Sequence, residues 1–212
     1  MGKIGQGILG GLSGKVGNVI GGSWKGIDYI RIKPTSVANP RTEGQVNQRN
    51  KFTATLEFLQ PNKDFVNVGY KSFAIKKTAF NAAMSYVLNN AIIGISPDFS
   101  VDYSSALLSK GILSKALNPT ADLTTAGQVS FSWDDNSTEN NAKRTDKAML
   151  LVYNPMKNES TYQLAGADRE TGTDVLIIPN TYAGDTVELF MAFVSLDGKV
   201  SNSSYIGSDI AS

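Results

Sequence analysis

The sequence predicts a mainly β protein with an α+β amino-terminal part, in which a β-hairpin and helices precede a carboxyl-terminal antiparallel β-sandwich. Three observations predict this fold class. The first 33 residues are rich in glycine, yet they carry β-branched and aromatic residues at short intervals. Apolar residues with helical spacing follow up to residue 90. Beyond them, about seven short apolar segments are separated by turn-forming residues, as in an antiparallel sandwich.

The glycine-rich start is the most unusual part of the chain. Ten of the 20 glycines lie at or before Gly26. Residues 14–31 are interpreted as two short extended pieces joined by glycines, and ordering so much glycine costs conformational entropy. We therefore expect packing partners to hold this segment, either as a strand pair clamped on the domain behind it or as an arm ordered by a neighbouring molecule.

A helix is predicted over residues 42–60. Thr42 suits the N-cap position and Gln45 stands three residues later, as a capping box requires. Apolar residues then fall on one helical face until Pro61 ends the pattern.

The segment after this helix is mixed. Residues 65–70 fit either a strand or a helix, and periodicity does not decide between them. An alanine-rich run predicts a second, short helix over residues 78–90. Residues 99–103 and 107–113 are interpreted as one or two strands, with a turn at Lys110–Gly111.

A change of composition suggests a domain boundary. Residues 118–127 have the Asn, Pro, Thr and Gly content of a linker, so we expect one domain over residues 1–117 and a β-sandwich over residues 118–212. Its first strand alternates apolar Val129, Phe131 and Trp133 with polar residues. The other predicted strands span residues 148–153, 161–164, 175–178, 187–194 and 200–206.

The composition argues against catalysis. The chain has no cysteine and no histidine, which removes thiolate nucleophiles, the usual neutral general base and the commonest metal ligand. We expect no enzyme activity, no catalytic residue and no cofactor. Neither acidic loop, at residues 134–146 or 168–174, has the spacing of a calcium loop, so no metal site is predicted.

Charge is distributed unevenly along the chain. Residues 1–115 carry 14 Lys and Arg against 6 Asp and Glu, whereas residues 116–212 carry 6 against 13, although the whole chain has a net charge of only +1. One explanation is two solvated domains that happen to differ. The other is a head-to-tail contact between the basic end of one copy and the acidic end of the next. Nucleic acid is not an expected partner at a pI near 7.8.

The start of the sequence is not a good export or membrane signal. No apolar run approaches the roughly 20 residues needed to span a bilayer, and the first residues make a poor signal peptide. We expect no membrane span, and the localisation stays open between an assembled particle and an extracellular filament.

The carboxyl-terminal part resembles a fibronectin type III domain. The resemblance covers roughly residues 119–212 and lies in residues 129–133, 150–153, 178–179, 187–195 and 197–203. It implies a sandwich that more often binds than catalyses. One departure is Phe190, which stands where the tyrosine of a tyrosine corner is expected.

Nearly the whole chain resembles an uncharacterised family found in Bacteroidota and their phages. The resemblance lies in the glycine-rich opening over residues 2–11, in Gly14–Gly17 and Ser23–Gly26, and in Asn39–Thr42. The family has no assigned activity. Its association with phage-like genes implies a particle or filament subunit, by analogy alone.

We therefore expect a non-enzymatic structural subunit that assembles with itself through its basic glycine-rich segment, and that displays the sandwich outward. Strand addition would supply main-chain hydrogen bonds, while apolar side chains fill pockets. Other virion or surface proteins are further expected partners. The alternative is a surface adhesion module that recognises glycan or protein through the sandwich loops. The expected interface residues are Lys15, Trp24, Lys25, Ile27, Tyr29, Ile30, Arg31 and Arg41.

Overall fold

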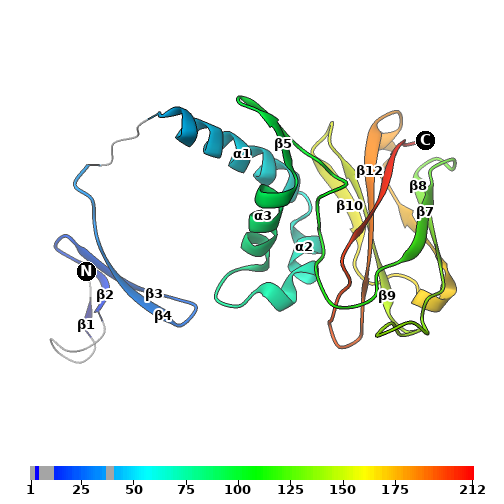
Figure 1. Ribbon diagram of the computed structural model, residues 1–212, viewed down its shortest axis with the longest axis horizontal. Helices are drawn as coiled ribbons and strands as arrows, with labels where there is room; N and C mark the ends of the chain where they lie inside the picture. The colour runs from blue at the N-terminus through cyan, green and yellow to red at the C-terminus, as the bar shows by residue number, and fades with distance from the viewer. Residues whose placement is uncertain (1–2, 5–11, 37–40) are drawn as a thin grey trace. The chain divides into compact units, whose positions relative to one another are not determined.

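A computed structural model describes residues 3–4, 12–36 and 41–212 (Figure 1). Among the segments that carry the resemblance to the uncharacterised family, residues 2 and 5–11 of the glycine-rich opening and Asn39–Pro40 lie outside the described residues. The chain divides into two compact units, residues 1–45 and 46–212.

The amino-terminal unit is one antiparallel sheet in the order β1-β2-β3-β4. Its strands are β1 (Lys3–Ile4), β2 (Leu12–Val16), β3 (Val19–Trp24) and β4 (Ile27–Ile32). The predicted hairpin is present, but β2, β3 and β4 are three strands where two extended pieces were expected. Two-residue turns join them, one at Gly17–Asn18 and the other at Lys25–Gly26. At the second turn Lys25 and Gly26 have φ values of 48° and 78°, as a type I′ hairpin turn requires.

Three α-helices follow: α1 (Glu43–Leu59), whose first turn precedes the start of the second unit, α2 (Lys63–Gly69) and α3 (Ala79–Asn90). The helices predicted over residues 42–60 and 78–90 are confirmed. Thr78 begins α3 as its N-cap, and its hydroxyl accepts a hydrogen bond from the Asn81 amide at 3.0 Å. The ambiguous segment after Pro61 is helical, and it buries Phe65 and Val66.

A two-stranded ribbon follows α3, formed by β5 (Ile92–Ile95) and β6 (Asp98–Val101). The predicted strand over residues 107–113 is wrong. Its main chain is held mostly by side chains instead of a ladder: the Leu108 amide donates to Ser203 Oγ and the Gly111 amide to Asn202 Oδ1, both at 3.0 Å. Only Leu113 forms an isolated bridge, to Ser201.

Seven strands form the predicted β-sandwich. One sheet has the order β11-β8-β7 and the other the order β10-β9-β12-β13, which is the three-plus-four arrangement of a fibronectin type III-like fold. The strands are β7 (Leu117–Asp122), β8 (Gln128–Asp134), β9 (Lys147–Asn154), β10 (Glu159–Gln163), β11 (Thr173–Ile177), β12 (Thr186–Val194) and β13 (Ser204–Ile210). Short 3₁₀ helices occur at Arg169–Thr171 and Asn180–Tyr182 within the sandwich, and at Lys71–Phe73 between α2 and α3.

The prediction of a linker over residues 118–127 is wrong for its first half, which belongs to strand β7. Pro119 lies inside this strand, but β7 is at the edge of its sheet, where proline is tolerated. The pairing with β8 is also irregular between Leu117 and Thr120, so the missing proline amide breaks no regular ladder there.

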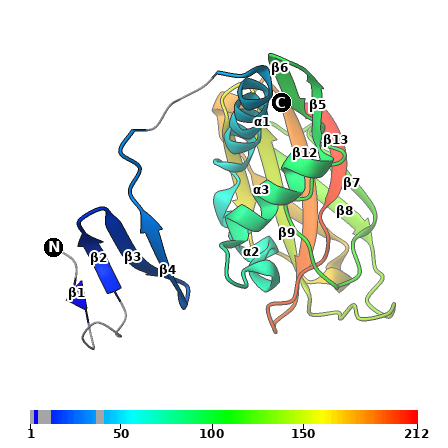
Figure 2. The same cartoon turned by 60° about the vertical axis from the view of Figure 1, so that its left-hand side comes forward.

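The four-stranded sheet of the sandwich lies between the helices and the three-stranded sheet, and its central strands β9 and β12 are buried on both faces (Figures 1 and 2). Along β9, Ala148, Leu150 and Val152 pack on the three-stranded sheet, whereas the alternate residues Met149, Leu151 and Tyr153 pack on the helices. Because the helices share this core with the sandwich, residues 46–117 and 118–212 belong to one compact unit, whereas the sequence placed a boundary between residues 117 and 118.

Phe190 of β12 belongs to the helix side of this core. Its ring centre lies 5.3 Å from that of Tyr205 and 6.4 Å from that of Phe58. Across the described residues, no helix is both long and apolar enough to pass through a membrane.

Candidate functional site

The predicted interface residues gather on the three strands β2, β3 and β4, which we call the amino-terminal meander. Residues that pair directly across an antiparallel ladder share a face of the sheet. Ile20 pairs with both Lys15 and Arg31, and Trp24 pairs with Ile27. Tyr29 pairs with Gly22, which lies two residues from Ile20 and two from Trp24 on β3, so Tyr29 shares this face. The structure therefore brings five predicted residues together: Lys15, Trp24, Ile27, Tyr29 and Arg31.

The other three predicted residues lie elsewhere. Ile30 faces the opposite side of the meander, because it pairs with Gly21. Lys25 is in the turn between β3 and β4, and Arg41 precedes α1, outside the sheet. Sequence reasoning missed Ile32, which shares the face of Ile30 two residues away on the same strand.

The meander exposes an unusual amount of apolar surface. All six residues of β4 are exposed. Trp24, Ile30 and Ile32 are 55%, 68% and 75% exposed. Because these apolar side chains lie on both faces of the sheet, a partner that covers them would add to the stability of the meander.

Strand β4 is also an open edge, because it ends the strand order of its sheet. The Lys33 amide donates to the Asn18 carbonyl at 2.7 Å, so odd-numbered residues of β4 bond to β3. By the alternation of an antiparallel ladder, the main-chain groups of Asp28, Ile30 and Ile32 point away from β3. They form the open row to which another strand can add.

Two glycines of β3 make room for their neighbours. A Cβ atom on Gly22 would stand 3.0 Å from the Tyr29 ring and hydroxyl, so the ring lies over this residue. A Cβ on Gly21 would clash with the Leu12 carbonyl, so β2 approaches closely there. A shallow groove of about 500 Å³ is lined by Leu12, Ser13, Gly22, Ser23, Asp28, Tyr29 and Ile30.

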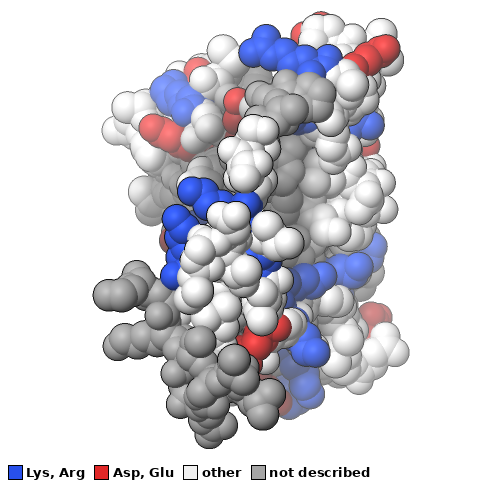
Figure 3. All heavy atoms as spheres, turned by 90° about the vertical axis from the view of Figure 1, so that its left-hand side faces the viewer, with Lys and Arg blue, Asp and Glu red and all other residues white. Residues whose placement is uncertain are grey.

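The meander and its flank are basic. Residues 12–36 contain four Lys and Arg side chains against one carboxylate, Asp28. Figure 3 shows lysine and arginine side chains, together with some Asp and Glu side chains, among uncharged residues on the side of the molecule that it draws. A basic rim around apolar side chains suits an acidic, apolar partner.

The acidic loops of the sandwich use their carboxylates within the fold. Asp146 binds Arg169, Asp168 binds Lys147 at 2.9 Å, and Asp174 accepts a hydrogen bond from the Ala167 amide at 2.7 Å. Within the described part of the chain, no three Asp or Glu side chains are grouped as metal ligands.

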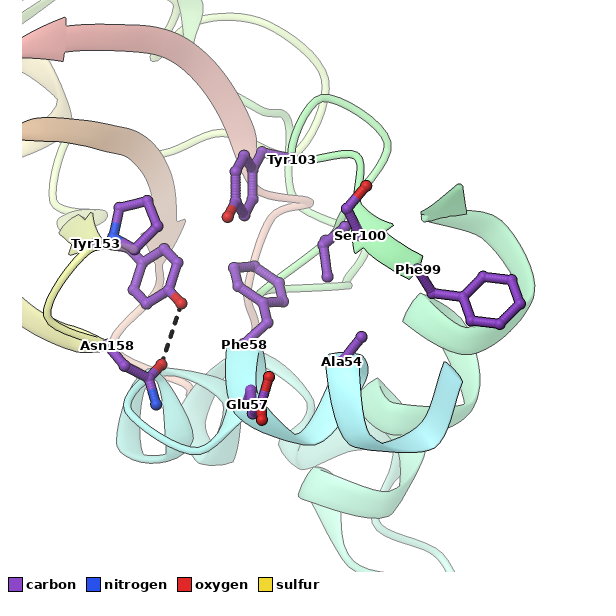
Figure 4. A pocket seen from close by; sticks show the side chains of 10 residues that line it. Ala54, Glu57, Phe58, Phe99, Ser100, Tyr103, Tyr153 and Asn158 are labelled. Carbon is purple, nitrogen blue, oxygen red and sulfur yellow. Dashed lines mark hydrogen bonds between the residues drawn. The ribbon is translucent and has the colours of Figure 1, made fainter. Parts of the chain in front are cut away.

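A second candidate is a cavity of about 420 Å³ in the helical layer, which we call the Tyr153 pocket. Its lining comes from α1, from β6 and the residues after it, and from the end of β9 and the turn that follows. Figure 4 shows the rings of Phe58, Tyr103 and Tyr153 near one another, with Glu57 on α1. Sequence reasoning missed this pocket, because its residues lie far apart in the chain and no local pattern joins them. The lining residues are Ala54, Glu57, Phe58, Phe99, Ser100, Val101, Tyr103, Tyr153, Pro155 and Asn158.

Comparison with known proteins identifies a family match. The model of a family of unknown function, DUF6266, matches residues 11–207. No curated protein matches, and no solved structure matches.

Proposed function

Because the chain belongs to the DUF6266 family, whose function is unknown, we propose a function from geometry: the protein is a non-enzymatic structural subunit that assembles with copies of itself through the amino-terminal meander. The sandwich would face outward from the assembly. We propose further that such a subunit belongs to a virion, a particle or a filament. The support for this part of the proposal is the resemblance to proteins of Bacteroidota and their phages, by analogy alone.

The observation that carries the proposal is strand β4. It combines an open main-chain edge with apolar side chains on both faces, of which Ile30 and Ile32 are the most exposed. Folded proteins usually protect such an edge with a charge, a proline or a covering element. Asp28 and Arg31 provide little protection beside Ile27, Tyr29 and the two exposed isoleucines.

Strand addition is the mechanism that these features favour. An added strand would satisfy the outward main-chain groups of Asp28, Ile30 and Ile32, which gives affinity without sequence specificity. The side chains of Trp24 and Ile30, on opposite faces, would then be covered by the partner. Burying one such apolar side chain contributes about 1.5 to 3 kcal/mol.

Charge would set the direction of assembly. Residues 1–115 carry an excess of basic groups and residues 116–212 an excess of acidic ones. A basic segment of one copy on an acidic surface of the next is a heterologous contact, which produces rings or open filaments. The alternative, an adhesion module using residues 134–146 and 166–174, has less support because these loops contain no aromatic residue.

Light scattering coupled to size exclusion tests the proposal over a wide range of protein concentration. We expect the mass of the full chain to rise with concentration. The double variant Ile30→Lys/Ile32→Lys should stay monomeric. Ile95→Lys is the matched control, because Ile95 is 83% exposed on a strand of the other unit. A full chain that is monomeric at every concentration would contradict the proposal.

A further inference from the structure

Three aromatic rings form a continuous wall of the Tyr153 pocket. The ring centre of Phe58 lies 5.5 Å from that of Tyr103 and 5.4 Å from that of Tyr153, and the two tyrosine rings are 6.0 Å apart. The cavity volume of about 420 Å³ falls within the usual range of ligand sites. The face of an aromatic ring attracts a cation through the electron density above the ring plane.

The polar groups of the pocket are acceptors placed around this wall. The Tyr153 hydroxyl donates its proton to Asn158 Oδ1 at 3.1 Å, as the dashed line in Figure 4 shows. Its oxygen lone pairs therefore remain available to accept a hydrogen bond from a ligand. Glu57 adds a carboxylate on the same side of α1 as Ala54 and Phe58.

The electrostatic environment is negative. Burial raises the pKa of the Tyr153 hydroxyl well above its usual value, and the nearby Tyr103, Glu57 and Glu188 raise it further. No lysine or arginine is among the lining residues. Within the described part of the chain, Glu57 makes no ion pair at 4.0 Å or less.

Two neighbouring cations are already engaged at the margin. The Lys51 ammonium lies 5.1 Å from the ring centre of Phe99, a lining residue. Lys157 precedes Asn158 but is paired with Asp185. The first contact is a cation–π pair at the edge of the pocket, on a ring that points away from the other three rings in Figure 4. Neither cation is paired with Glu57.

We propose that the Tyr153 pocket binds an organic cation, an alkylammonium or guanidinium group, between its aromatic wall and Glu57. The rings hold the cation, the Tyr153 oxygen accepts one of its N–H groups, and the carboxylate neutralises its charge. A free small cation is one source of this group. The other is Lys15 or Arg31 on the meander of a second copy, and this source rests on the proposed self-assembly.

The proposal that the ligand of the Tyr153 pocket is a cation is tested with the full chain and two probes of nearly equal shape, N-acetyl-arginine amide and its neutral citrulline analogue. Ring resonances of Tyr103 and Tyr153 report binding by NMR. We expect saturable shifts with the arginine probe and at least about tenfold weaker binding of the citrulline probe. Equal binding of the two probes, or no saturable shift with the arginine probe, would overturn the inference.

Glu57→Gln tests the carboxylate, and Glu43→Gln is its control because Glu43 is an exposed acid at the start of the same helix. Both side chains are exposed, so both variants should fold. We expect Glu57→Gln to weaken the arginine probe about threefold to fivefold, and Glu43→Gln to leave its affinity unchanged. Identical affinities of the two variants would remove Glu57 from the site.

The source of the cation is tested by the association of the chain. If a second copy supplies it, Glu57→Gln and the double variant Lys15→Gln/Arg31→Gln should weaken association to the same extent, with no further loss on combination. Association unaffected by Glu57→Gln would assign the pocket to a free cation. A chain that binds the arginine probe yet never associates would contradict self-assembly and leave the pocket proposal standing.

Discussion

Arg169 forms an ion pair with Asp146 in which neither side chain reaches solvent. The two side chains are 0% and 1% exposed, and both Nε and Nη2 of Arg169 lie 3.2 Å from Asp146 Oδ2. The guanidinium also donates to Asn136 Oδ1 at 2.7 Å and to the Ser114 carbonyl at 2.9 Å, and its central carbon lies 3.8 Å from the Phe193 ring centre. This pair therefore ties the loop before β9 to the turn before β11.

Arg169→Met should destabilise the protein by about 3 to 5 kcal/mol, because the buried Asp146 side chain would lose its guanidinium partner. Urea unfolding followed by circular dichroism measures the change. Arg144→Met is the control, since its ion pair with Glu170 is exposed and long, at 3.9 Å. We expect less than about 1 kcal/mol there. Equal losses in the two variants would contradict the buried-pair account.

Glu188 makes stability depend on pH. Burial raises the pKa of its carboxyl above the usual value, although the Tyr205 hydroxyl, which donates to Oε2 at 2.7 Å, opposes part of this rise. Since the folded pKa exceeds the unfolded pKa, the stabilising contribution is complete below the unfolded pKa of about 4.3 and is lost as pH rises through the folded pKa.

Glu188→Gln should remove this dependence and keep an acceptor for the Tyr205 hydroxyl. The free energy of unfolding of the unmodified chain, compared with that of Glu188→Gln, should fall as pH rises from about 4 to neutral. Urea unfolding at a series of pH values gives both curves. Parallel curves across this range would show that Glu188 is not perturbed in the folded state.

Loss of the N-cap of α3 should lower the stability of the protein by less than loss of the buried Arg169–Asp146 pair. Thr78→Ala should cost about 1 kcal/mol, because the Asn81 amide loses its side-chain acceptor. Thr78→Ser keeps a hydroxyl at this position and should retain most of the stability. Thermal unfolding of the three chains would reveal the order, and Thr78→Ser as unstable as Thr78→Ala would exclude capping as the cause.

Proline substitutions at neighbouring positions of β4 test the contribution of its open edge and that of its ladder with β3 independently. Ile30→Pro removes an amide that points away from β3, so the meander should stay folded while self-association is lost. Arg31→Pro removes an amide that bonds to β3 and should disrupt the meander itself. Circular dichroism reports folding and light scattering reports association. Normal association of Ile30→Pro would show that the edge is not the contact.

Local chemistry explains which elements could be predicted from the sequence. The long helix ends at Leu59, before Pro61, but its predicted apolar face is not the buried one, because Phe52 and Leu56 are exposed. Helix α3 follows from its alanine-rich run after Thr78. The segment at residues 107–113 looked like a strand because it is apolar. Three of its amides instead donate to side chains of Asn202 and Ser203, about ninety residues away, which no local pattern encodes.

The candidate surface was predictable only in part. Alternation places Trp24, Ile27 and Tyr29 near one another once the turns are known, and Lys25–Gly26 is the signal for the second turn. The first turn, at Gly17–Asn18, makes three strands of the expected two. Alternation along β4 then puts Ile30 on the opposite face from Ile27 and Tyr29. The Tyr153 pocket depends on tertiary packing of α1 against β9, which periodicity cannot supply.

Hydrogen exchange of individual β4 amides tests strand addition most directly. In a dilute monomer the outward amides of Asp28, Ile30 and Ile32 should exchange faster than the ladder amides of Tyr29 and Arg31. As concentration rises and the chain associates, the account predicts that the outward amides become protected together. Association in which these amides continue to exchange freely would contradict assembly through the β4 edge.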